Sequence, residues 1–198
     1  MPLFTSNDKK IFFLHIPKNA GSTVESFLSK HSSMTFFGET LINQKVPAQH
    51  LTYNDLQLVC ENFIGLKKFC IVRHPCSRLI SEFFYRKVKR GRSASNWNIL
   101  KFLITYNLKR LRNNSVYSNH IRPQSDFISN DVEVFKLEQN GLIMALDYCS
   151  KYLDINCDFQ LIESKNITNS KSFKPNWLLR IATFIIYNKD YKNFNYSL

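Results

Sequence analysis

A lysine, two hydroxyl residues and two small residues lie close together in residues 15–23, directly after an apolar stretch. The segment HIPKNAGST has Lys18 first, then Ala20 and Gly21, and then Ser22 and Thr23, where a helix is expected to begin. Small residues let the backbone approach an anion, successive N–H groups can surround it, and a helix N-terminus adds a favourable dipole. These residue types at this spacing predict a loop that binds a phosphate-like group.

This loop differs from the nucleotide-triphosphate P-loop, GxxxxGK[ST], in which the lysine follows the last glycine and precedes the hydroxyl that holds magnesium. Here Lys18 precedes Gly21. Magnesium-dependent enzymes of that class also need an aspartate at a strand end, whereas the second apolar stretch of this chain runs into Arg73. The pattern favours anion binding without a metal. Glu138 and Glu163 stand at the ends of later predicted strands, however, so a carboxylate metal ligand stays an open alternative.

A second cluster of anion-binding residues follows that stretch. Arg73 stands at the strand end, Pro75 suits the first position of a helix, and Arg78 and Ser81 are three residues apart on one helical face. A guanidinium and a hydroxyl near a helix N-terminus are suited to a phosphate group. We therefore expect a second phosphate site here.

Both clusters require a strand, a loop and a helix in that order. The apolar patterns predict strands at 11–15, 69–72, 132–138 and 158–163, and helices that begin at Ser22 or Thr23 or lie within 51–65, 75–91, 141–153 and 177–191. Strands that alternate with helices favour parallel pairing with right-handed crossovers. The predicted fold is α/β, a single P-loop-like three-layer domain over residues 1–198 with a mostly parallel central sheet flanked by helices.

Residues 96–112 are apolar nearly all round in their first half and basic at their end. They can form a buried helix with a solvated basic end, or a mobile lid or acceptor-facing helix. The sequence does not decide between these two interpretations.

Composition narrows the class of protein. The chain has 198 residues, 44% of them hydrophobic, and its 27 basic against 15 acidic residues give a net charge of +12. A chain of this size and hydrophobic content buries a substantial core, so disorder is excluded, and the charge predicts an anionic partner. Its five cysteines contain no CxxC pair, which argues against a structural metal or a disulfide scaffold. No signal peptide or membrane-spanning run is visible, which predicts a cytoplasmic protein.

HIPKNAGST followed by IVRHPCSRLISEFFY resembles the sulfotransferase superfamily that uses 3′-phosphoadenosine 5′-phosphosulfate (PAPS), and more closely its carbohydrate branch, related to enzymes that sulfate heparan, dermatan and chondroitin. The similarity continues through residues 120–128 and 132–140 and into the tail. It implies a sulfotransferase that moves a sulfuryl group from PAPS in line to a hydroxyl acceptor, expected to be a glycan or another carbohydrate, without a metal. Oligomeric state is not implied.

The resemblance also assigns roles to residues. It implies that Lys18 contacts the bridging oxygen of the leaving phosphate, and that Arg73 and Ser81 bind the 3′-phosphate. Lys171, in a segment similar to the family's variable loop, is expected over the nucleotide. The residues expected to hold the 5′ end are Asn19, Ala20, Gly21, Ser22 and Thr23, and those expected on the acceptor side are His120, Arg122 and Gln124.

Five histidines compete for the role of general base. His15 and His74 are expected to be structural at the corners of the two anion loops, and His31 lies in a serine-rich turn. Several carbohydrate-type members place a catalytic histidine in the region of His50, and a neutral imidazole suits proton acceptance near pH 7. His50 is therefore the predicted base, with His120 as the second choice.

Two other functions stay open. A P-loop-type small-molecule kinase would use the same anion loops. A basic nucleic-acid-binding protein would use the basic runs interleaved with aromatic residues, but no recognition-helix, RNP-like or zinc-finger pattern is present, so no nucleic-acid partner is expected.

Overall fold

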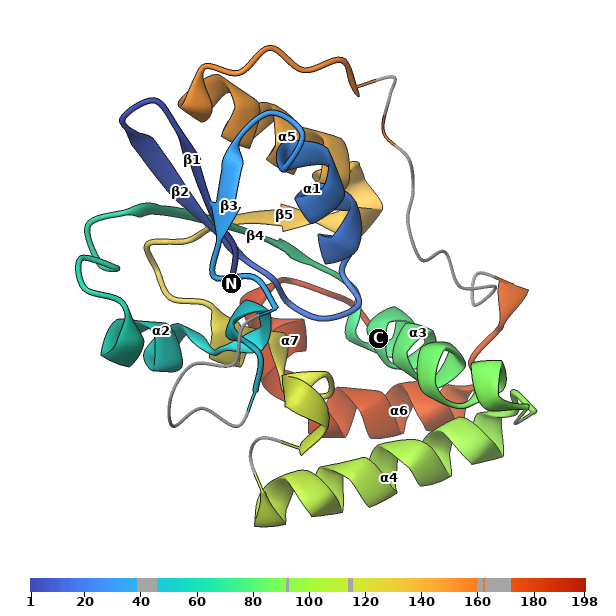
Figure 1. Ribbon diagram of the computed structural model, residues 1–198. Helices are drawn as coiled ribbons and strands as arrows, with labels where there is room; N and C mark the ends of the chain where they lie inside the picture. The colour runs from blue at the N-terminus through green and yellow to red at the C-terminus, as the bar shows by residue number, and fades with distance from the viewer. Residues whose placement is uncertain (39–45, 92, 114–115, 160–161, 163–171) are drawn as a thin grey trace.

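A five-stranded sheet forms the centre of the computed structural model, which describes residues 1–38, 46–91, 93–113, 116–159, 162 and 172–198. The strands are β1 (Leu3–Ser6), β2 (Lys9–Leu14), β3 (Ser33–Thr35), β4 (Lys67–Val72) and β5 (Glu133–Lys136). Their order across the sheet is β3-β1-β2-β4-β5 (Figure 1). The predicted α/β class is confirmed.

The sheet is mixed. β2, β4 and β5 are parallel neighbours, with Phe13 opposite Phe69 and Phe69 opposite Glu133. β1 runs antiparallel to both β2 and β3. Neither β1 nor β3 was predicted, because strands of 4 and 3 residues carry too little alternation to be recognised in the sequence.

Helices cover the sheet and extend beyond one of its ends. The α-helices among the described residues are α1 (Gly21–Leu28), α2 (Tyr53–Val59), α3 (Pro75–Arg86), α4 (Asn96–Arg112), α5 (Gly141–Leu153), α6 (Trp177–Ile186) and α7 (Asn188–Asn193). Short 3₁₀ helices are η1 (Ala48–His50), η2 (Val88–Arg90), η3 (Val116–Asn119), η4 (Gln124–Phe127) and η5 (Leu137–Gln139).

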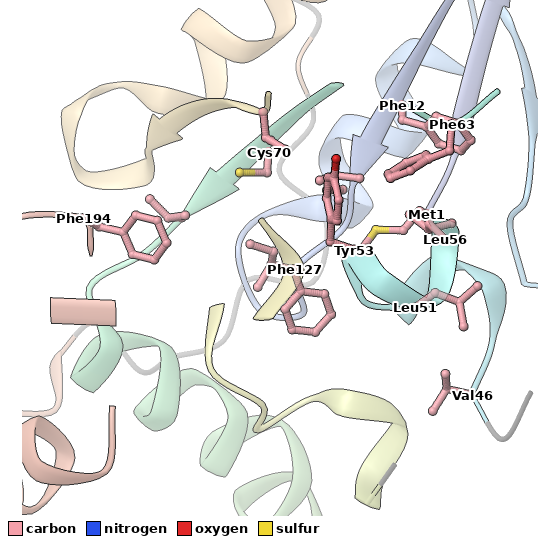
Figure 2. Close-up of a cluster of buried hydrophobic side chains, with 14 residues drawn as sticks. Met1, Phe12, Val46, Leu51, Tyr53, Leu56, Phe63, Cys70, Phe127 and Phe194 are labelled. Atoms are coloured by element: carbon pink, nitrogen blue, oxygen red, sulfur yellow. The ribbon is translucent and has the colours of Figure 1, made fainter. Parts of the chain in front are cut away.

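Alternate residues of β2 point to opposite faces of the sheet, as the twofold period of a strand requires. Phe12 and Leu14 join the cluster that includes Leu56 of α2 (Figure 2). Ile11 and Phe13 join a second cluster beneath α1 and α5. This burial on both faces produces the predicted layering of helices on a sheet.

A third apolar cluster holds α3, α4 and α6 together at the lower right of Figure 1. Phe83 of α3 and Phe102 of α4 meet edge to face with ring centroids 5.4 Å apart. Residues 96–112 thus form a helix whose buried face packs against α3 and α6. The described helices include none that is both long and apolar enough to cross a bilayer.

Three expectations about elements were wrong or fall partly outside the described residues. The helix expected over 177–191 breaks at Tyr187 into α6 and α7. In the strand expected at 158–163, residues 158, 159 and 162 are not extended in the sheet, and the others lie outside the described part of the chain. The cap of α1 is Ala20 rather than Ser22 or Thr23, because the backbone turns into the helix two residues earlier.

Candidate active site

The two predicted anion loops meet at one edge of the sheet. β2 and β4 are parallel neighbours, so their carboxyl ends lie together at the edge where α/β proteins commonly bind ligands. Nη1 of Arg73 donates a hydrogen bond to the carbonyl oxygen of Lys18 at 3.4 Å. Two segments more than fifty residues apart in the sequence therefore form one site.

A cleft of about 990 Å³ opens at this edge, and most of the predicted site residues line it. They are Lys18, Ala20, Gly21, Ser22, Thr23, His50, Arg73, Ser81 and His120. Asn19, Arg122 and Gln124 are not among its lining residues, and Lys171 lies outside the described part of the chain.

The first loop reaches the cleft through two residues in the left-handed backbone region. Lys18 has φ 73° and Ala20 has φ 64°, although neither is glycine. Such conformations cost roughly 1–3 kcal/mol each and are concentrated at functional sites. The first backbone hydrogen bonds of α1 run from Thr23 and Val24 to the carbonyl of Ala20, so the N–H groups before them remain at the helix N-terminus, where anions bind.

Gly21 is required here by a close approach rather than by an unusual backbone angle. A Cβ atom at this position would lie 2.6 Å from Cε1 of His15, well inside van der Waals contact. Nδ1 of the same imidazole is paired with Glu25 of α1, which holds the ring in place. The glycine of the motif therefore makes room for His15 beside the start of α1.

One face of α3 forms another wall of the cleft. Ser77, Ser81 and Tyr85 all line it and follow Arg73 at intervals of four residues, so they share one helical face. Nζ of Lys18 lies 4.0 Å from the centre of the Tyr85 ring, a cation–π contact that orients the lysine. Ser77 and Tyr85 were not predicted, although their spacing in steps of four residues from Arg73 could have identified them.

Gln124 connects the two anion loops by hydrogen bonds to both of them. Its Oε1 accepts hydrogen bonds from Nδ2 of Asn19 at 2.7 Å and from the N–H of Arg73 at 2.9 Å, while its Nε2 donates to the carbonyl of Arg73 at 2.8 Å. Its own N–H donates to Asp190. The side chain is fully buried and does not line the cleft, so Gln124 positions the loops rather than contacting an acceptor. Asn19 acts with it, donating also to the carbonyl of Ile71.

Two arginines that the sequence placed near ligands are engaged elsewhere. The buried Arg78 donates to the carbonyls of Pro17, Arg122 and His120 at 2.8–3.0 Å. It therefore fastens the first anion loop to residues 120–122 and does not face a phosphate. Nε of Arg122 donates to Asp126 at 2.8 Å, outside the lining of the cleft.

Three imidazoles stand in a row along the cleft wall. The ring of His50 lies edge to face with those of His15 and His120, at centroid distances of 5.2 and 4.7 Å. The outer two each have a carboxylate partner, because Glu25 pairs with His15, and Glu82 accepts from Nδ1 of His120 at 3.0 Å. Nδ1 of His50 is buried and has no hydrogen-bond partner among the described residues.

Burial, reinforced by the neighbouring His15 and His120, lowers the pKa of His50 far below its ordinary value. Burial also lowers the pKa of His120, against the opposite effect of Glu82. Both rings are therefore neutral near pH 7, which is the form that can accept a proton.

Glu82 anchors one end of this row. It is 1% exposed and is paired with Arg86 as well as His120. Burial alone would raise its pKa, but the hydrogen bond from His120 and the charge of Arg86 outweigh burial and lower it. The carboxylate therefore stays ionised and fixes the orientation of His120.

The acidic side chains that the structure describes do not converge on a metal site. Glu138 accepts hydrogen bonds from the N–H of His74 at 2.8 Å and from the hydroxyl of Tyr196 at 3.0 Å, while Glu163 lies outside the described residues. Within the part of the chain that the structure describes, no three His, Cys, Asp or Glu side chains are grouped so that they could hold a metal ion. The ring of His74, held by the carbonyl of Ser197, closes the strand–helix corner.

The arrangement combines two cations, hydroxyl groups, a helix N-terminus and neutral imidazoles, which suits the binding and transfer of an anionic group. The fold is similar to that in the crystal structure of a sulfotransferase from Alicyclobacillus acidocaldarius, with a TM-score of 0.53, 13% identity, and coverage of 97% of this chain and 98% of that chain. No curated protein sequence matches this chain. The family model described as "Sulfotransferase family" matches residues 1–197. This chain therefore belongs to the sulfotransferase family.

Proposed function

We propose that this sulfotransferase takes the sulfuryl group from PAPS and transfers it in line to a carbohydrate hydroxyl, with His50 as the general base. The observation that carries the proposal is the meeting of Lys18 and Arg73 in one cleft, since two cations and two helix N-termini suit a donor with phosphate groups at both ends.

The residues of the cleft fit this donor. PAPS supplies an activated sulfuryl group when bound. The N-terminus of α1, with Ser22 and Thr23, would hold the 5′ end, whereas Arg73 and Ser81 would hold the 3′-phosphate. Burial lowers the pKa of the Arg73 guanidinium, with Glu138 opposing this effect, and a partly desolvated cation is stabilised by a nearby anion.

Lys18 is placed to stabilise negative charge on the leaving oxygen. Its ammonium group lies over the ring of Tyr85, and this cation–π contact orients it in the cleft. Sulfuryl transfer depends mainly on positioning and charge stabilisation, so a lysine oriented before reaction contributes to the rate more than to ground-state binding.

His50 combines the two properties a base needs, because it lines the cleft and stays neutral. The low pKa of His50 applies to the protein without a bound ligand, since an anion bound in the cleft would raise the pKa of an imidazole beside it. His120 shares both properties, and donation of its Nδ1–H to Glu82 leaves Nε2 as the nitrogen that could accept a proton. His120 therefore stays the second candidate, while His50 differs in having a buried Nδ1 with no hydrogen-bond partner among the described residues.

A carbohydrate acceptor is supported by the resemblance of the anion motifs to the carbohydrate branch and by the net charge of +12, which suits an acidic polysaccharide. The acceptor class is tested by transfer of labelled sulfate from PAPS to a panel of glycans, lipids and small alcohols. Transfer only to non-carbohydrate acceptors would contradict it.

The donor is tested by calorimetry with adenosine 3′,5′-bisphosphate and AMP. Wild-type protein should bind the bisphosphate about tenfold to a hundredfold more tightly, since a charge-assisted contact contributes roughly 1.5–3 kcal/mol. Arg73→Ala should remove the preference, whereas Arg122→Ala, a matched arginine outside the cleft, should keep it. Equal affinities in the wild type would refute the donor assignment.

The base and the reaction class are tested together. His50→Ala should lower turnover by about 10²- to 10⁴-fold with bisphosphate affinity nearly unchanged. If His50→Ala keeps more than half the wild-type rate and His120→Ala does not, the assignment moves to His120. Activity that EDTA abolishes and magnesium restores would favour a kinase.

A further inference from the structure

The outer face of α4 is apolar although the helix is already packed on its inner face. Trp97, Ile104, Leu108 and Leu111 are all exposed, with Trp97 at 70% and Leu111 at 71%. Their spacing of seven, four and three residues places them on one side of the helix. An amphipathic helix of a water-soluble protein normally presents polar residues there.

α6 continues this apolar surface. The two helices begin side by side, because the N–H of Asn176 donates to Oδ1 of Asn96 at 2.9 Å, and they lie next to each other in Figure 1. Trp177 is 72% exposed in the first turn of α6, and Leu178, Ile181 and Ile185 are exposed behind it. Both tryptophans of the chain lie in the first turns of these two helices, beside the hydrogen bond between Asn96 and Asn176, and we call the exposed apolar residues of the two helices the α4/α6 face.

The surroundings of the α4/α6 face are strongly basic. Lys101, Lys109 and Arg112 are exposed on α4 beside the apolar stripe. Between Glu82 and Asp126 the sequence contains no acidic residue. The basic residues of α4 itself are Lys101, Lys109, Arg110 and Arg112.

We propose that the α4/α6 face binds the surface of an anionic lipid bilayer. Tryptophans sit favourably at the level of lipid headgroups, and exposed Leu and Ile side chains can enter the acyl boundary. Long basic side chains beside them keep their charges among lipid phosphates. A second copy of the chain is disfavoured as the occupant, because a symmetric contact would bring these basic residues together.

The face is separate from the cleft. Cys76, Leu79, Ile80 and Phe83 of α3 pack toward α4 and α6, while Ser77 and Ser81 face the cleft. Changes on the outer side of α4 should therefore leave transfer to a soluble acceptor unchanged.

The experiment uses the two native tryptophans as the probe. Protein is mixed with vesicles of phosphatidylcholine alone or with about one third phosphatidylserine, at about 0.15 M salt. We expect a blue shift of tryptophan emission and co-sedimentation with the anionic vesicles only. Absence of both would overturn the proposal.

Variants separate the apolar and charge contributions. Leu108→Ser with Leu111→Ser should weaken vesicle affinity about tenfold or more, while Leu58→Ser with Ile64→Ser, which are at least as exposed elsewhere on the chain, should not. Lys101→Glu with Arg112→Glu should weaken it by about thirtyfold or more, since each basic residue near an anionic bilayer contributes about 1 kcal/mol, with Lys10→Glu and Lys151→Glu as the control. Equal effects of the paired variants would count against the face.

Two further outcomes would assign the face to a different partner. If light scattering shows a dimer that dissociates in the Leu108→Ser, Leu111→Ser variant, the face is a self-association surface. The same emission shift with soluble poly-glutamate, without vesicles, would make it a site for an acidic protein chain.

Discussion

Replacing Gln124 by methionine tests whether one buried side chain holds the two anion loops together. Methionine has nearly the same length and volume but lacks the oxygen and nitrogen of the side-chain amide. The substitution removes three hydrogen bonds of 2.7–2.9 Å, and it leaves the N–H and C=O of Arg73 and one N–H of Asn19 without their partners.

The structure sets the size of the effect. Each buried polar group left unsatisfied costs roughly 1–3 kcal/mol, and the lower end applies because Arg73 is only partly buried and water can reach its backbone. Three groups then cost about 3 kcal/mol, out of a typical total stability of about 5–15 kcal/mol. In a chain of 198 residues this lowers the melting temperature by about 6–12 °C.

The measurement is urea unfolding followed by circular dichroism, with bisphosphate affinity as a second readout. Gln124→Met should lower both the free energy of unfolding and the affinity, since Arg73 loses its backbone support. Gln139→Met, at an exposed position, is the control. A loss of less than about 1 kcal/mol for Gln124→Met, with affinity unchanged, would refute the reasoning, because water would then replace the amide.

Three other changes have defined outcomes. Gly21→Ala should lower the free energy of unfolding by about 1–3 kcal/mol through overpacking, and truncating His15 to Ala in the same chain should relieve part of that loss; additive effects in urea unfolding would contradict the predicted contact. Tyr85→Leu should slow turnover about fivefold, since a cation–π contact with Lys18 contributes roughly 1 kcal/mol, while Tyr85→Phe keeps the rate; equal rates for all three proteins would contradict it. Because the pKa of Glu82 is lowered in the folded state, its contribution to stability is present above the unfolded carboxyl pKa and is lost as pH falls. Wild type should therefore lose more stability than Glu82→Gln between about pH 5 and pH 3, and parallel pH profiles would refute this.

Local chemistry made the two anion loops predictable. Each loop follows an apolar strand directly in the sequence and leads into the start of a helix. Lys18, Gly21 and Arg73 could therefore be recognised without knowing which residues lie near them in the folded protein. Parallel pairing of β2 and β4 then followed from the strand–helix order, and the structure confirms it. The helix at residues 96–112 was also predicted, but not that its outer face stays apolar and exposed.

The roles of single side chains depended on partners far away in the sequence. Gln124 and Arg78 were placed near ligands because their types suit anions and acceptors, yet most of their side-chain hydrogen bonds go to backbone groups 42–61 residues distant. The row of His15, His50 and His120 likewise comes from three separate segments. A sequence determines which local backbone can bind an anion, because that depends on neighbouring residues. Only tertiary packing decides which polar side chains remain facing the cleft, because each buried polar group must first satisfy its own hydrogen bonds.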